Sequence, residues 1–145
     1  MQVERVKTNG SAIETMRLMH CMVDRYYLDM APYAHYSLLQ IYNTIKAIPF
    51  REDPPEEETL QRPIYTMQQR GTGGDCDDKA IVLASWARLH NIPFRFVAVR
   101  RPDKEQLHHV FPELYIMDRW LHCDPTYAFN VLGREREAYA ERVYV

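Results

Sequence analysis

The chain has 145 residues and a mass of 17.2 kDa, enough for one domain with a hydrophobic core of its own. Hydrophobic residues make up 46% and aromatic residues 12% of the sequence, which excludes an intrinsically disordered chain. The formal net charge of −2 and the pI of about 6.3 indicate no basic surface, so we expect neither a nucleic-acid partner nor attraction to an anionic membrane.

The sequence begins without an apolar run that could act as a signal peptide, and no apolar stretch approaches the length of a membrane span. A cytoplasmic location is therefore expected. The three cysteines, Cys21, Cys76 and Cys123, are odd in number and lack the CxxC spacing of a zinc ribbon. We expect reduced thiols and no disulfide framework.

The first third of the chain has the period of amphipathic helices. Ser11 and Glu14 have the spacing of a capping box, and the apolar positions that follow predict a helix over about 12–29. The same period over 38–48 predicts a second helix, which a proline ends. Prolines and carboxylates dominate 49–63, which is typical of a solvated surface connection.

A buried helix and a sheet are predicted in the remainder. After the glycine-rich segment 71–74, residues 80–89 are apolar on nearly every side, as in a helix at the centre of a domain. Alternating and β-branched patterns then predict three antiparallel strands, over 94–100, 107–116 and 120–124. The C-terminal RVYV, residues 142–145, adds a possible fourth strand.

This order predicts an α+β fold in a single domain over 1–145, with a buried helix packed on an antiparallel sheet of three to four strands. The helical part covers about 11–70, the buried helix about 76–90 and the sheet about 94–145.

Cys76 is placed in the first turn of the buried helix, where free amides and the helix dipole favour a thiolate, so it is a candidate nucleophile. His108 and His109 lie in the second strand, and Asp124 ends the third. Because side chains alternate along a strand, only one of the two histidines can face the cysteine. Asp124 would be a diagonal neighbour of His109, ~7–8 Å away by backbone. Pro112 cannot donate to a ladder and leaves the register open.

Three stretches together resemble one family: GDCDDKAIVLASWARLHNIPFRFVAV, HVFPELY and WLHCDPTY. They are similar to the transglutaminase-like superfamily of papain-type folds, over about residues 58–127. The resemblance implies Cys76 as nucleophile, His109 as base and Asp124 as the acid that orients the histidine. The lead-in ETLQRP also resembles that of small transglutaminase-like proteins encoded among bacteriophage and prophage structural genes.

The resemblance implies acyl transfer through a thioester, that is, hydrolysis or transamidation of an amide in a peptide or protein substrate. The Cys76 amide would hold part of the oxyanion, and Gln68 or Gln69 would supply the second donor, although no pattern distinguishes the two. The alternative is a noncatalytic assembly or binding module of a phage-like particle, with phage structural proteins as partners and the particle as location.

Three carboxylates flank the cysteine: Asp75, Asp77 and Asp78. They oppose ionisation of a thiol, so another role is needed. Asp75 is placed to cap the helix, and the other two complement its dipole. Because similar residues flank the nucleophile in bacterial transglutaminase-like cysteine proteinases, some of them calcium-dependent, a calcium site is the alternative. Otherwise no cofactor is expected.

Overall fold

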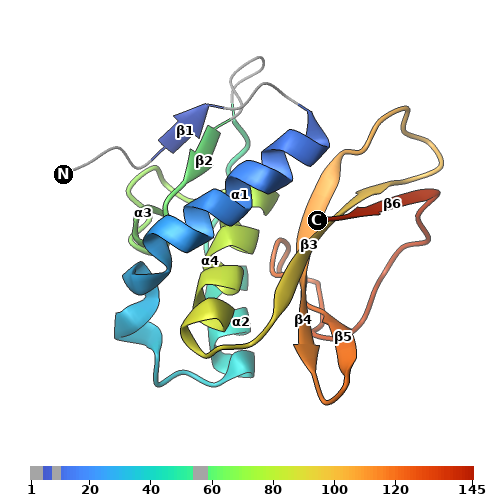
Figure 1. Ribbon diagram of the computed structural model, residues 1–145. Coiled ribbons are helices and arrows are strands. Elements are labelled where there is room, and N and C mark those ends of the chain that lie inside the picture. The colour runs from blue at the N-terminus through green and yellow to red at the C-terminus, as the bar shows by residue number, and fades with distance from the viewer. Residues whose placement is uncertain (1–4, 8–10, 54–58) are drawn as a thin grey trace.

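Helices and sheet are segregated in this protein, and one helix, α4, lies between them (Figure 1). The computed structural model describes residues 5–7, 11–53 and 59–145. The helices are α1 (Ala12–Tyr26), the 3₁₀ helix η1 (Tyr27–Tyr33), α2 (Leu38–Lys46), α3 (Pro63–Met67) and α4 (Cys76–Leu89). The strands are β1 (Arg5–Lys7), β2 (Thr59–Gln61), β3 (Phe94–Arg100), β4 (His109–Ile116), β5 (Arg119–His122) and β6 (Glu141–Tyr144).

The first predicted helix is shorter than expected. Ser11 caps α1 by accepting a hydrogen bond from the Glu14 amide, but the α-helix ends at Tyr26 and continues as the tighter η1. Pro32 lies inside η1 and has no N–H for an α-helical hydrogen bond. Among the described residues, no helix combines the length and apolar composition that crossing a membrane requires.

The helix α4 forms the centre of the core. Its buried residues include the consecutive run 80–87, and it packs against α1, α2, α3, β3 and β4. Helix α1 covers one side of it through a cluster with Met16, Met19 and Phe96, and α2 covers another side through Ile41 and Ile45. A helix that is apolar on nearly every side is stable only when covered in this way.

The sheet has the strand order β5-β4-β3-β6, and every pair is antiparallel. Met117 and Asp118 both have positive φ and form the tight turn between β4 and β5. The C-terminal segment adds β6 to the far side of β3. The predicted fold class is therefore confirmed: a buried helix packed on an antiparallel sheet, here with four strands.

One expectation is wrong. The stretch 49–63 was expected to be a solvated connection, but Thr59–Gln61 forms the buried strand β2, which pairs with β1. Helix α3 then starts at Pro63, a residue favoured in a first helical turn. Residues 54–58 of the same stretch lie outside the described residues.

Candidate active site

Cys76 is the first residue of α4, and a capping pair of aspartates, Asp75 and Asp78, defines that position. The Asp75 carboxylate accepts a hydrogen bond from the Asp78 amide at 3.2 Å, and the Asp78 carboxylate accepts one from the Asp75 amide at 3.1 Å. Asp78 also accepts from the Gln61 amide of β2 at 2.9 Å. This reciprocal capping starts the helix at Cys76 and ties it to β2.

The loop before α4 needs glycine. Gly73 has φ +126°, and a Cβ there would lie 2.1 Å from the carbonyl oxygen of Pro49. The close approach lets the Gly74 amide donate to the same oxygen at 3.1 Å. The segment after α2 is thereby joined to the loop that carries Cys76.

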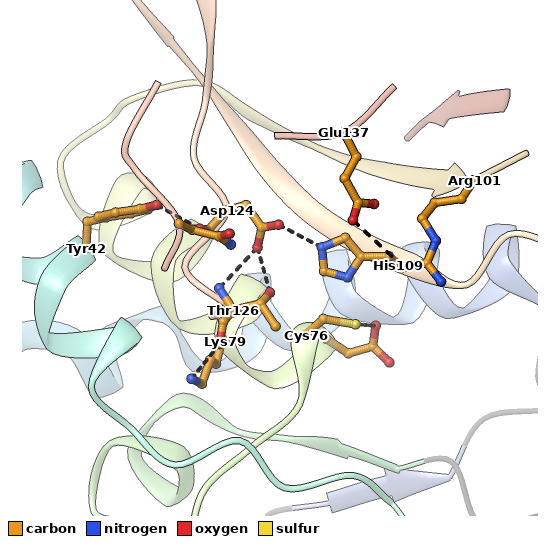
Figure 2. Close-up of polar contacts among 10 residues, drawn as sticks. Tyr42, Cys76, Lys79, Arg101, His109, Asp124, Thr126 and Glu137 are labelled. Carbon is orange, nitrogen blue, oxygen red and sulfur yellow. Dashed lines mark hydrogen bonds and ion pairs between the residues drawn. The ribbon is translucent and has the colours of Figure 1, made fainter. Parts of the chain in front are cut away.

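The thiol of Cys76 is in a negative, desolvated environment. Burial, and then the charge of Asp77, raise its pKa well above the ordinary value. A hydrogen bond from the Val110 amide opposes this rise. The thiol donates a weak hydrogen bond to Asp77 Oδ1, with sulfur and oxygen 3.7 Å apart (Figure 2). The resting cysteine is therefore a neutral thiol at neutral pH.

The strand register explains the donor on Val110. The Tyr115 amide donates to the carbonyl oxygen of Pro93, next to β3, so the amides of the odd-numbered residues of β4 point toward β3. The amide of Val110, an even-numbered residue, points to the opposite side, toward β5. On that side β5 ends at His122, which pairs with Glu113. The Val110 amide thus lies beyond the end of its neighbouring strand, where it can reach the sulfur.

His109 and Asp124 form a direct pair, with His109 Nε2 and Asp124 Oδ2 separated by 2.7 Å. Extending the β4–β5 register places Asp124 opposite Phe111, so His109 is its diagonal neighbour, as expected from the sequence. An ionised carboxylate only accepts, so Nε2 carries the proton and Nδ1 is left as an acceptor. In Figure 2 the second ring nitrogen lies on the side of Cys76.

Thr126 holds the other oxygen of Asp124. Its amide and hydroxyl donate to Asp124 Oδ1 at 3.1 and 2.6 Å, a local turn around Pro125. Burial raises the pKa of Asp124, but the hydrogen bonds from His109 and Thr126 outweigh it, so that pKa lies below its ordinary value. Asp124 is ionised at neutral pH.

The backbone around Asp124 is anchored by distant residues (Figure 2). The Tyr42 hydroxyl of α2 and the Asn130 amide group donate to the Asp124 carbonyl oxygen at 2.8 and 3.2 Å. The Lys79 ammonium of α4 donates to the carbonyl oxygens of Thr126 and Ile48 at 2.9 and 2.6 Å. Lys79 is 1% exposed, and its burial lowers its pKa to about 8.

One cavity brings Cys76 and His109 together. It is lined by Ala12, Thr15, Met16, Cys76, Asp77, Ala98, Gln106, Leu107, His108, His109 and Val110. His108 was expected to face away from the cysteine by strand parity. That expectation is wrong, because His108 also lines the cavity. His108 precedes the first residue of β4, so the alternation of side chains along a strand does not apply to it.

The two glutamines are placed elsewhere. Gln68 and Gln69 follow α3, are exposed and do not line the cavity. The Gln68 side chain accepts a hydrogen bond from Arg70 at 2.8 Å. The structure does not bring either one to Cys76, and an oxyanion role for them stays a prediction without geometric support.

The acidic residues do not converge on one point. Asp75 and Asp78 cap the helix, whereas Asp77 faces the cavity. Burial raises the pKa of both capping carboxyls, and that of Asp75 further because Asp78 lies beside it. In the described ranges, no group of three or more His, Cys, Asp or Glu residues is arranged to hold a metal ion.

Sequence reasoning missed the residues that hold Asp124 and the turn after it: Tyr42, Lys79, Thr126 and Asn130. Only Thr126 had a local signal, because Asp-Pro-Thr has the spacing of a side-chain turn.

Comparison with known proteins identifies the family of the chain. No curated protein matches the chain significantly. A crystal structure of a proposed cysteine protease from Cytophaga hutchinsonii aligns with 95% of this chain at 15% identity and a TM-score of 0.48, and the chain spans 56% of that protein. The sequence profile of the transglutaminase-like superfamily matches residues 25–125, a range that includes Cys76, His109 and Asp124. The chain therefore belongs to the transglutaminase-like superfamily.

Proposed function

We propose that this protein is a cysteine-dependent acyl-transfer enzyme that cleaves or exchanges an amide through a thioester. Cys76 is the nucleophile, His109 the general base and acid, and Asp124 the group that orients the imidazole. The observation that carries this proposal is the 2.7 Å contact between His109 and Asp124 beside the cavity that Cys76 also lines. Membership of the superfamily supports the same chemistry.

Each proton has a place in this scheme. His109 Nδ1 takes the thiol proton while sulfur attacks the carbonyl carbon. The carbon–nitrogen bond then breaks, and His109 gives the proton to the departing amine. Water or a second amine attacks the thioester, which yields an acid or a new amide and restores the thiol. The ionised Asp124 stabilises the imidazolium that forms in each half-reaction.

The raised pKa of Cys76 favours proton removal during attack rather than a preformed thiolate. The thiol must turn from Asp77 to His109 before it reacts. The amides of Cys76, at the helix start, and of Val110, already directed at the sulfur, are the donors we assign to the oxyanion.

Acylation by p-nitrophenyl acetate tests this proposal without knowledge of the natural substrate. We expect an acetyl group on Cys76, found by peptide mass spectrometry, and none on Cys21 or Cys123. His109→Ala should acylate at least about 100-fold more slowly, because general acid–base catalysis contributes about 10²–10⁴-fold. The matched variant His108→Ala should stay close to the wild type.

The fate of the acetyl group then distinguishes two reactions. Release at a rate independent of added primary amine indicates hydrolysis, and capture by the amine indicates transamidation. The proposal is overturned if the acylation rate is the same in His109→Ala as in the wild type, or if acylation occurs first at Cys21. In that case the noncatalytic assembly or binding module, with a phage structural partner, becomes the better hypothesis.

A further inference from the structure

We propose that Tyr127 is a positioning residue for the reaction: the face of its ring holds the plane of the His109 imidazole and stabilises the imidazolium that forms when His109 takes the thiol proton. This inference rests on the proposed function, because it concerns the proton transfer between Cys76 and His109. Tyr127 acts through His109 and need not touch the substrate.

The rings of Tyr127 and His109 lie nearly parallel. Their planes differ by 22°, and their centroids are 6.0 Å apart, within the ~4.5–7 Å of offset-stacked aromatic pairs. Phe111 also lies beside the imidazole, at 5.9 Å, but its plane is tilted by 39°. Of these two rings, Tyr127 is therefore the one that presents its face to His109.

Tyr127 is itself held in place by its neighbours. The Phe129 ring stacks on it with centroids 5.1 Å apart and planes 13° apart, and the Phe50 ring lies 5.4 Å away. The Tyr127 carbonyl oxygen accepts a hydrogen bond from the Asn130 amide at 3.0 Å. The ring is thus in position before the reaction, so no reorganisation is needed when charge forms on His109.

The turn after β5 supplies both contacts of the imidazole. Asp124 binds Nε2, and Tyr127, three residues later, covers part of the ring face. Because Asp124 occupies Nε2 and Nδ1 must receive the thiol proton, the imidazole has no nitrogen left for a hydrogen bond to Tyr127. The contact of Tyr127 with His109 is therefore one between ring faces.

The charge on the imidazolium gives this contact its effect. Burial, and then the charge of an ionised Cys76, raise the pKa of Tyr127 above its ordinary value, so its hydroxyl is neutral at pH 7. The negative face of an aromatic ring attracts a cation within ~6 Å, more strongly where water is excluded. The side chains of His109 and Asp124 are only 10% and 7% exposed.

Acylation of Cys76 by p-nitrophenyl acetate tests the inference. Tyr127→Leu should acylate about 5-fold more slowly or worse, whereas Tyr127→Phe should stay within about 2-fold of the wild type. Placing 3,4,5-trifluorophenylalanine at position 127 keeps the shape of phenylalanine but withdraws negative charge from the ring face. This variant should be about 3-fold or more slower than Tyr127→Phe.

Tyr115→Leu is the matched control. It removes a tyrosine ring of similar exposure, 39% against 36% for Tyr127, which packs on Trp120 instead of His109. The acylation rate of Tyr115→Leu should equal that of the wild type.

A double-mutant cycle separates an effect through His109 from general support of the fold. In the His109→Ala background no imidazolium forms, so Tyr127→Leu should change the rate by less than about 2-fold. A loss that persists in this background overturns the inference. Equal rates for phenylalanine and trifluorophenylalanine at position 127 also overturn it, even if Tyr127→Leu does not fold.

Failure of this inference is distinguishable from failure of the proposed function. If acylation depends on His109 but is the same in Tyr127→Leu as in the wild type, only the role of Tyr127 is wrong. If acylation does not depend on His109, the proposed function is wrong and the role of Tyr127 with it.

Discussion

The ammonium of Lys79 donates a hydrogen bond to the carbonyl oxygen of Thr126 at 2.9 Å, and so joins the helix that begins at Cys76 to the turn that follows Asp124. Lys79 lies three residues after Cys76 in α4, and Thr126 directly contacts the Asp124 carboxylate. The same ammonium donates to Ile48, after α2. One buried cation therefore connects three segments around the site.

Lys79→Met should lower the free energy of unfolding by about 2–4 kcal/mol, because it leaves two buried carbonyl oxygens without donors. Urea denaturation followed by circular dichroism measures this change. Lys104→Met, at an exposed position, is the control and should change stability by less than about 0.5 kcal/mol. Equal stability of the two variants would show that Lys79 does not hold the turn.

Thr126→Val should move the acid side of the pH–rate profile to higher pH. The lost hydroxyl donates to Asp124 at 2.6 Å and helps to keep its pKa low, so without it Asp124 protonates at higher pH. We expect a shift of about one pH unit in acylation of Cys76 by p-nitrophenyl acetate. Thr44→Val removes a hydroxyl that bonds only within α2 and should cause no shift. An unshifted profile in Thr126→Val would contradict this role.

The sequence predicted those parts of the site that depend on local signals. Asp75 before the apolar run marked the start of α4, and alternation in β4 made His109 a diagonal neighbour of Asp124. The supports of Asp124 were not predictable in this way. Lys79 is buried because carbonyl oxygens from residues 48 and 126 converge on it, and no local pattern encodes contacts over such separations.

Two other sequence predictions were not met, because they too depend on structure outside the local pattern. Strand β2 is buried because it pairs with β1, more than 50 residues earlier in the chain, although its neighbours in sequence are prolines and carboxylates. Gln68 and Gln69 lie upstream of Cys76, but the end of α3, with φ +52° at Gln69, leaves both on the surface.

Added calcium should not raise the melting temperature. The carboxylates of Asp75 and Asp78 accept hydrogen bonds from each other's amides, and Asp78 also accepts one from Gln61, so these oxygens do not form a shared site with Asp77. Thermal unfolding with calcium and with a chelator measures the effect. A rise with calcium that chelation reverses, and that Asp77→Asn abolishes, would instead establish a calcium site, because a ligand that binds only the folded state stabilises it.

Asp77→Asn should lower the pKa of Cys76. Burial raises that pKa first, and the charge of Asp77 raises it further, so loss of the charge favours the thiolate. The pH at which iodoacetamide alkylation of Cys76 reaches half its maximum should fall by about one unit. Asp118→Asn is the matched control and should leave the midpoint in place. A midpoint that stays or rises in Asp77→Asn would show that Asp77 carries no charge beside the thiol.

Asp75→Asn should weaken the dependence of stability on pH. Burial, and then the charge of Asp78, raise the pKa of Asp75 well above its ordinary value in the folded protein, whereas an unfolded aspartate titrates at about 3.9. Between these values the folded state binds a proton that the unfolded state has lost, so this residue makes the protein less stable as the pH rises through that window.

Asparagine caps a helix about as well as aspartate and does not titrate. Melting temperatures from pH 5 to pH 9 should therefore decline less in Asp75→Asn than in the wild type, with Asp118→Asn as the control. The same decline in all three proteins would mean that Asp75 is ionised in the folded state and that the carboxylate pair at the start of α4 shares no proton.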